Sequence, residues 1–163
     1  DNSDTLTIHQ RIKIKKQYDQ FLEENIENSL TEISETIKSY HKNIMLSIAV
    51  KPDFEAAKKL YYQNWQKWLS ENLCDYVVLM NYNSENNIFY KNLEKVKLLN
   101  KAKKLVIGIA TYNQNNNAVI ERINNILNEN FVGYNLFSFN DLRKKANLIK
   151  MLKKVNFNIN VTN

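Results

Sequence analysis

Residues 64–89, NWQKWLSENLCDYVVLMNYNSENNIF, decide the fold of this chain. They contain the end of a helical pattern, an apolar run over residues 76–80, and then the polar and aromatic group Asn81, Tyr82 and Asn83. The apolar run leaves no position for a solvent-facing side chain, so we expect a parallel β-strand covered on both sides by helices. Parallel α/β folds place their ligands beyond the carboxyl ends of the strands. We therefore predict a functional site at the three residues after this run.

Four short apolar runs predict four strands. They are Asn43–Val50, Tyr76–Tyr82, Leu105–Tyr112 and Gly133–Phe139. Their starts are about thirty residues apart, which is the usual length of a βαβ unit. Strands that alternate with helical segments imply right-handed crossovers and parallel pairing. The predicted fold class is therefore α/β, built from parallel (β/α) units.

Apolar residues at helical spacing predict helices before and between these strands. One stripe consists of Leu22, Ile26, Leu30, Ile33, Ile37 and Tyr40, and a second of Ala57, Tyr61, Trp65, Trp68 and Leu69. We expect both stripes to be core faces. Further helices are predicted over residues 87–101, 117–129 and 141–154, with Asp53 and Asn140 as N-caps.

The number of strands decides between two architectures. A closed (β/α) barrel has eight strands and typically about 250 residues, whereas this chain of 163 residues supplies four predicted strands. We expect the carboxyl-terminal half of a TIM-type barrel, with a four-stranded open parallel sheet as the alternative. In this interpretation residues 1–163 form one domain or domain fragment, with a loop over 1–16, alternating helices and strands over 17–155, and a tail over 156–163.

The composition limits the classes of function. The chain is 44% hydrophobic and 25% charged, with a formal charge of +6, which makes nucleic-acid binding through surface lysines a weak alternative. The lysines fall mainly on polar positions of predicted helices, where solvation is the simpler explanation. The single cysteine, Cys74, is expected to be buried, and His9 and His41 have no ligand-spaced neighbours. We therefore expect no disulfide, no metal site, no cofactor and no membrane span.

A series of short motifs resembles one known family. The motifs are Trp65 with Trp68 and Leu69, then Asp75-Tyr76-Val77, Met80-Asn81-Tyr82, Gly108-Ile109-Ala110-Thr111-Tyr112 and Gly133–Ser138. In this order they resemble the bacterial glycoside-hydrolase-like proteins related to family ten. The resemblance covers roughly residues 43–142 and implies that these strands are the last four of a glycosidase-type barrel. It also implies an association with the cell envelope.

The chain departs from the family pattern in three places. Asn83-Ser84-Glu85 replaces the more usual threonine and acidic residue after the tyrosine. Leu79 stands where the family usually has a proline before the methionine. The acidic pair that the family carries near the end of its fourth strand would precede Asp1. The resemblance therefore implies that this chain lacks the catalytic carboxylate pair, and we assign no catalytic residue.

Glycosidic bond hydrolysis usually needs two carboxyl groups, about 5 to 5.5 Å apart for retention or about 6.5 to 9.5 Å apart for inversion. Asp53 and Asp141 sit where helices begin and Glu85 lies in a polar loop, so all three are better explained structurally. Tyrosine rings and amides at strand ends are instead suited to packing on sugar rings and binding hydroxyl groups. The predicted ligand-binding residues are Asn81, Tyr82, Asn83, Tyr112, Asn113 and Asn140.

The expected partner is an oligosaccharide or polysaccharide. The predicted function is a glycoside-hydrolase-like domain that contributes part of a glycan-binding cleft, and the alternative is a non-catalytic glycan-binding or structural module. We also expect the sheet edges to be covered, either by a missing amino-terminal barrel half or by self-association.

Overall fold

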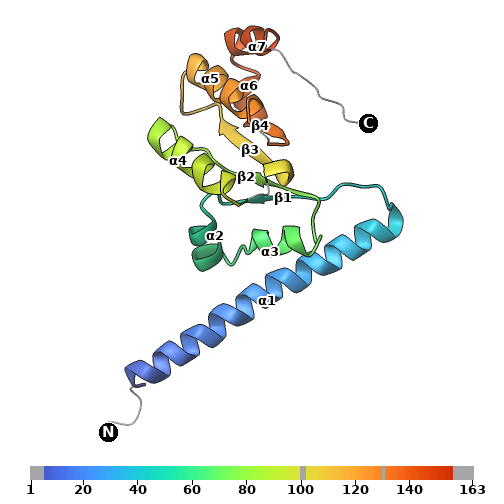
Figure 1. Ribbon diagram of the computed structural model, residues 1–163, viewed down its shortest axis with the longest axis vertical. Helices are drawn as coiled ribbons and strands as arrows, with labels where there is room; N and C mark the ends of the chain where they lie inside the picture. Colours follow the sequence, from blue (N-terminus) through green and yellow to red (C-terminus); the bar gives the residue numbers. More distant parts are fainter. Residues whose placement is uncertain (1–5, 100–101, 130, 156–163) are drawn as a thin grey trace.

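A computed structural model of the protein describes residues 6–99, 102–129 and 131–155, which form a single parallel sheet with helices (Figure 1). The long helix α1 comes first (Ile8–Tyr40). It is followed by β1 (Ser47–Val50), α2 (Phe54–Tyr61), α3 (Trp65–Ser70), β2 (Tyr76–Leu79) and α4 (Asn86–Lys97). After the short 3-10 helix η1 (Ala102–Lys104) come β3 (Leu105–Ala110), α5 (Asn116–Leu127), β4 (Gly133–Phe137), α6 (Phe139–Leu142) and α7 (Ala146–Leu152).

The sheet order follows the chain order, β1-β2-β3-β4, and every strand pair is parallel. Ser47 lies opposite Tyr76, and Val106 lies opposite both Val78 and Gly133. The predicted α/β class with parallel (β/α) units is therefore confirmed. A four-stranded open sheet of this order is consistent with part of a TIM-type barrel, and β1 and β4 are its edge strands.

The two faces of the sheet differ in burial. Helices cover one face, where six strand side chains are buried: Val50, Val77, Leu79, Leu105, Ile107 and Ile109. On the other face Ala49 and Asn135 are exposed, and Phe137 is 46% exposed. The expectation that helices cover both faces is therefore wrong for the described residues. An apolar run does not distinguish a second helix layer from the inside of a barrel, because both bury the side chains on that face.

The segment between β1 and β2 forms two short helices. Asp53 caps α2 as predicted, since its Oδ1 accepts a hydrogen bond from the Ala56 N–H at 3.1 Å. The expected single helix is interrupted at Tyr62, which has a left-handed backbone with φ of 56°. Trp65 and Trp68 are buried in the core as predicted, at 0% and 2% exposure.

Polar contacts join the amino ends of β1 and β2. The Asp75 carboxylate accepts a hydrogen bond from the Leu46 N–H at 2.6 Å, and the Asp75 N–H donates to the Leu46 carbonyl at 2.9 Å. Cys74 beside it is buried, and this burial raises the pKa of its thiol to about 11. Both residues therefore stabilise the end of the sheet opposite the predicted site.

Helix α1 begins earlier than expected. The sequence predicts a loop over residues 1–16, whereas α1 starts at Ile8 after a capping box formed by Thr7 and Gln10. Lysines between the apolar residues of this segment conceal the helical pattern. The rest of the predicted loop, residues 1–5, lies outside the described residues.

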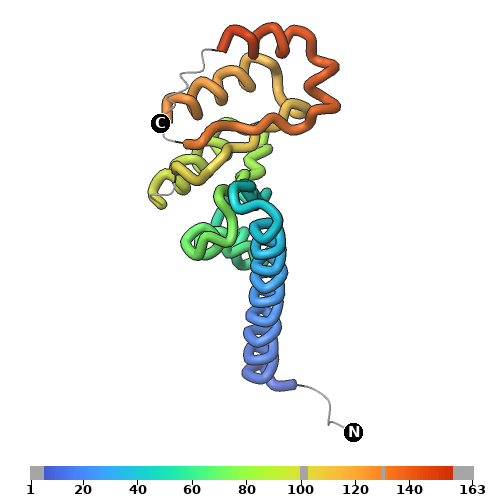
Figure 2. The backbone as a smooth tube through the Cα atoms, turned by 90° about the vertical axis from the view of Figure 1, so that its right-hand side faces the viewer, coloured from blue at the N-terminus to red at the C-terminus, as the bar shows by residue number. Residues whose placement is uncertain are grey.

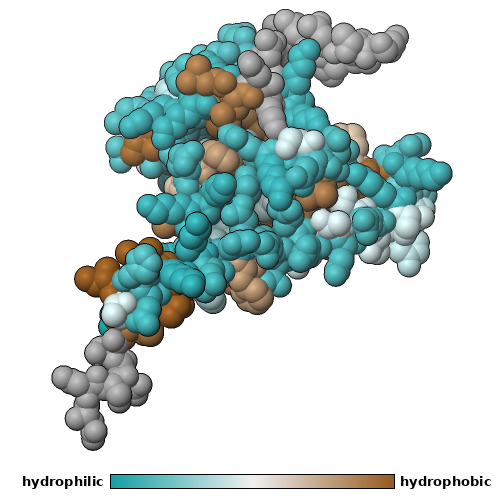
Figure 3. All heavy atoms as spheres, turned by 60° about the horizontal axis from the view of Figure 1, so that its bottom comes forward, coloured by the Kyte–Doolittle hydropathy of each residue, from teal (hydrophilic) through white to brown (hydrophobic). Residues whose placement is uncertain are grey.

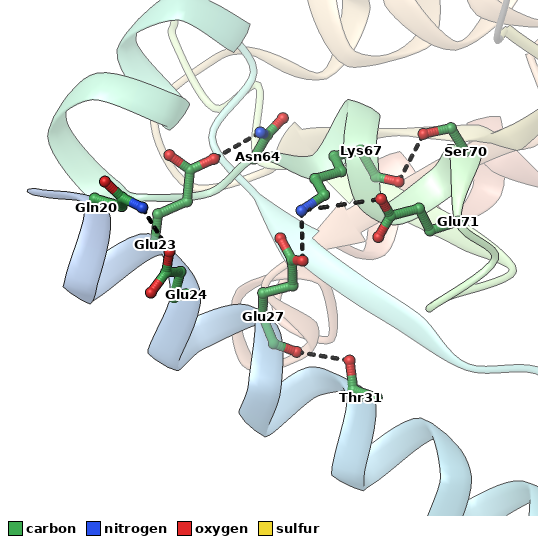
Figure 4. A network of polar contacts seen from close by, with 9 residues as sticks. All are labelled: Gln20, Glu23, Glu24, Glu27, Thr31, Asn64, Lys67, Ser70 and Glu71. Atoms are coloured by element: carbon green, nitrogen blue, oxygen red, sulfur yellow. Dashed lines mark hydrogen bonds and ion pairs between the residues drawn. The ribbon is translucent and has the colours of Figure 1, made fainter.

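The apolar stripe of α1 is mostly not a core face, contrary to the prediction. Leu30 is buried at 8% exposure, whereas Ile33 is 50% and Tyr40 is 81% exposed. Polar side chains from the neighbouring side of α1 contact the domain instead (Figure 4). Glu23 accepts a hydrogen bond from the Asn64 amide at 2.6 Å. Glu27 pairs with Lys67 at 2.5 Å.

The end of the chain also differs from the prediction. The expected helix over residues 141–154 is split into α6 and α7. Ser138, not Asn140, is the N-cap of α6, because its hydroxyl accepts a hydrogen bond from the Asp141 N–H. Asn140 lies inside α6. The predicted tail, residues 156–163, is outside the described residues.

No described helix combines the length and apolarity that crossing a membrane requires.

Candidate functional site

Three aromatic rings meet at the carboxyl ends of adjacent strands. Tyr82 follows β2, Tyr112 follows β3, and Phe137 ends β4. The Tyr82 and Phe137 rings are stacked, with centroids 5.0 Å apart and planes 12° apart. Tyr112 meets Phe137 edge-on, with centroids 6.3 Å apart. Tyr112 is 52% and Phe137 46% exposed. We call these three residues the aromatic cluster, and it presents accessible ring surface at the predicted edge.

A glycine makes room for the aromatic cluster. A Cβ atom on Gly108 of β3 would lie 2.9 Å from Cε1 of Tyr82 and 2.6 Å from the Leu79 carbonyl oxygen. Ala110, the next residue on the same face of β3, pairs with Phe137 of β4. Small side chains on β3 therefore allow the aromatic rings to lie against the face of the sheet that the helices leave uncovered. Burial against this face raises the pKa of the Tyr82 hydroxyl.

Two of the predicted amides support the loops around the cluster. The Asn113 Nδ2 donates a hydrogen bond to the Tyr82 carbonyl at 2.8 Å, which links the ends of β2 and β3. The Asn83 Oδ1 accepts from the Glu85 N–H at 2.8 Å, which closes a local turn. Asn113 is exposed and Asn83 is half-buried. Both lie beside the aromatic cluster, and their contact with a ligand stays a prediction.

The other two predicted amides occupy different surroundings. Asn81 is 1% exposed, and its Nδ2 donates to the Phe89 carbonyl at 3.0 Å while its Oδ1 accepts from Asn92 at 2.9 Å. These bonds attach α4 to the end of β2. Asn140 is exposed on α6, beyond the end of β4. The structure thus groups Tyr82, Asn83, Tyr112 and Asn113, with Asn81 beneath the surface. For Asn81 and Asn140, ligand contact also stays a prediction.

Arg122 is a buried residue of this region that the sequence analysis missed. It lies on α5 with 0% exposure, and its guanidinium carbon is 4.1 Å from the centroid of the Phe89 ring. Its nitrogens donate to the carbonyls of Asn83 at 2.7 Å and Ser84 at 2.9 Å, and to the Asn86 side chain at 2.8 Å. Burial lowers the pKa of the guanidinium.

Arg122 therefore fixes the loop that follows Asn81 and Tyr82. The sequence signal was an arginine inside an apolar helical pattern, between Val119 and Ile123. A charged residue in such a pattern is buried only if it is hydrogen-bonded, so it indicates a specific polar contact.

Two of the three carboxylates near this edge lie beside lysines, and the third, Glu85, makes no side-chain hydrogen bond to its helix. Asp53 caps α2 and forms an ion pair with Lys95, which together hold its pKa below the ordinary value. Asp141 lies in α6, with its Oδ2 3.7 Å from Lys145 Nζ. Glu85 is exposed at the N-cap position of α4. Within the described ranges no group of three or more metal-ligating side chains is present.

The parallel sheet with helices defines an α/β domain that is consistent with part of a (β/α) barrel, and it carries aromatic and amide side chains at its carboxyl edge. A family model described as glycosyl hydrolase-like 10 matches residues 7–125, and the chain belongs to this glycosyl hydrolase-like family. The match begins before α1 and ends in α5, so it includes Tyr82, Tyr112 and Arg122. The family resemblance is confirmed, although the Gly133–Ser138 motif lies beyond the matched residues. Comparisons with curated proteins and with solved structures gave no significant match.

Proposed function

We propose that the carboxyl edge of this sheet forms part of a glycan-binding cleft. The observation that carries the proposal is the aromatic cluster, whose Tyr112 and Phe137 are about half exposed on neighbouring strand ends. Aromatic rings with accessible surface pack against the C–H faces of sugars, while nearby amides bind hydroxyl groups. Membership in a glycosyl hydrolase-like family supports carbohydrate as the class of ligand.

The surroundings of the carboxylates favour a binding role for the described residues over a catalytic one. Asp53 caps helix α2 and forms an ion pair with Lys95, and Asp141 lies beside Lys145. A glycosidase needs one carboxyl group able to give up a proton and a second able to act as base or nucleophile. In our proposal such groups come from strands that complete the barrel, and this edge supplies sugar-packing surface.

Binding is tested by following the amide signals of the chain by NMR while a panel of oligosaccharides is added. We expect shifts in residues 82–84 and 111–114, and a loss of affinity of about tenfold in Tyr112→Ala, because one stacking ring is removed. Tyr40→Ala is the matched control, since Tyr40 is an exposed tyrosine at the end of α1. Binding that is equally strong in both variants would contradict the proposed cleft.

A separate assay addresses catalysis. The same oligosaccharides are incubated with the chain, and the release of reducing ends is measured. We expect binding without turnover. Hydrolysis that depends on Asp53 or Asp141 would show that this edge carries the reaction itself.

A further inference from the structure

The amino-terminal half of α1 projects from the domain with its apolar side chains uncovered. Residues 8–18 are all exposed, including Ile14 at 49% and Tyr18 at 57%. Figure 2 shows this part of α1 extending well beyond the sheet and the other helices. Figure 3 shows apolar side chains gathered on α1 near this end. Burying exposed apolar side chains is favourable, so this half of α1 is suited to contact with another surface.

The carboxyl-terminal half of α1 borders an open apolar groove. The groove has a volume of about 510 Å³ and lies between α1, the edge strand β1 and α3. Its apolar walls include Leu22, Ile26, Leu30, Ile33, Ile48 and Trp68. Asn25 and Ser29 line the same groove and have smaller side chains than the apolar residues of α1 beside them. The protein therefore has an uncovered apolar helix and an open apolar groove on two halves of one element.

The charges on α1 divide in the same way. The amino-terminal half carries four basic residues, Arg11, Lys13, Lys15 and Lys16, and one acidic residue, Asp19. The carboxyl-terminal half carries five acidic residues, Glu23, Glu24, Glu27, Glu32 and Glu35, and one basic residue, Lys38. Two parallel copies of α1 would place like charges together. Two antiparallel copies would place the basic half of each beside the acidic half of the other.

We propose that two copies of this chain form a symmetric dimer through antiparallel α1 helices. With the two-fold axis between Phe21 and Leu22, Ile14 of one copy lies level with Ser29 of the other, and Tyr18 lies level with Asn25. Large apolar side chains then face the smaller positions of the groove. Each α1 supplies one projecting half and one groove, so the contact closes at two copies. The two sheets lie at opposite ends of the paired helices, which leaves both aromatic clusters open.

The mass in solution gives the first test. Light scattering over a series of concentrations should give twice the chain mass of 19.3 kDa. Phe21→Glu should raise the dissociation constant at least about tenfold, because it places a charge at the centre of the contact. Gln20→Glu is the matched control, since it adds the same charge at the next position, on the opposite side of α1. Circular dichroism checks that both variants stay folded, as expected for residues on the surface of the helix.

A charge exchange distinguishes this dimer from other forms of self-association. Arg11 and Glu32 are equally far from the proposed axis, so they face each other between copies. Arg11→Glu and Glu32→Arg should each weaken the dimer, and the double variant should restore it. A monomer at all concentrations, an assembly that grows beyond two copies, or a double variant weaker than both single variants would each overturn the proposal.

Discussion

The ring of Tyr82 occupies the space that a side chain at Gly108 would fill. A Cβ atom at Gly108 would lie 2.9 Å from the Tyr82 ring and 2.6 Å from the backbone oxygen of Leu79. The ring could rotate away, but the backbone oxygen belongs to β2 and cannot move without disturbing the sheet. The stacking of Tyr82 on Phe137 therefore depends on a glycine of β3, the strand that lies between β2 and β4.

Gly108→Ala should destabilise the protein by about 1 to 3 kcal/mol, because the added methyl group overpacks the contact between β2 and β3. Urea unfolding monitored by tryptophan fluorescence measures this change. Ala49→Val is the control, since Ala49 is an exposed small residue on the same face of the sheet. If both variants have the stability of the wild type, the close approach of Tyr82 to Gly108 is not present in solution.

Arg122→Met should cost about 3 kcal/mol of stability, because it leaves the carbonyl oxygens of Asn83 and Ser84 without their donor. We also expect faster hydrogen exchange in residues 84–88, which Arg122 holds against α5. Arg143→Met, at an exposed arginine on the protein surface, should change neither quantity measurably. Equal effects of the two substitutions would show that Arg122 does not fix the loop.

The sequence was sufficient to predict the sheet but not its surroundings. Each of the four apolar runs contains one observed strand, because short β-branched runs between helical patterns have few other ways to bury their side chains. The predicted strands extended past Leu79 and Ala110. Beyond these residues Asn81 and Tyr82 form tight turns, each donating its N–H to the carbonyl two residues earlier, and the chain bends over residues 111–114. The exposure of Ile33 on α1 was not predictable, since a periodic stripe identifies a helix but not the surface that covers it.

The sequence predicted only part of the candidate site. Tyr82 and Tyr112 were identified because the ends of parallel strands meet at one edge. Phe137 was assigned to a strand and not to the site, because the face it occupies depends on the register of β3 with β4. The partners of Arg122 lie more than thirty residues away in the chain, so no local pattern indicated them.

Asn81→Ala should destabilise the protein by about 2 kcal/mol, because it removes two hydrogen bonds of a buried side chain and takes away the acceptor of the Asn92 amide. Asn113→Ala is the natural comparison, since the exposed Asn113 side chain makes one hydrogen bond, to the Tyr82 carbonyl, and its loss should cost no more than about 1 kcal/mol. Thermal unfolding of both variants provides the measurement. The opposite order of stability would indicate that Asn81 faces solvent and is free to contact a ligand.

The pair of Asp53 and Lys95 should make stability depend on pH in the acid range. Both the ion pair and the Ala56 N–H hold the pKa of Asp53 below its ordinary value of 3.8. A carboxyl group with a lowered pKa stabilises the fold above the pKa of the unfolded chain, and this stabilisation is lost as the pH falls through the folded-state pKa. Asp53→Asn keeps a side chain able to cap α2 but removes the charge.

We therefore expect the free energy of unfolding of Asp53→Asn to lie below that of the wild type by up to about 1 kcal/mol at neutral pH, since the pair is partly exposed. The difference should shrink as the pH falls below 3.8, the ordinary pKa of the group. Urea unfolding at a series of pH values measures it, and Lys95→Met should give the same convergence from the other side of the pair. A difference that is constant with pH would mean that Asp53 acts only as a neutral cap and that its charge contributes nothing to the fold.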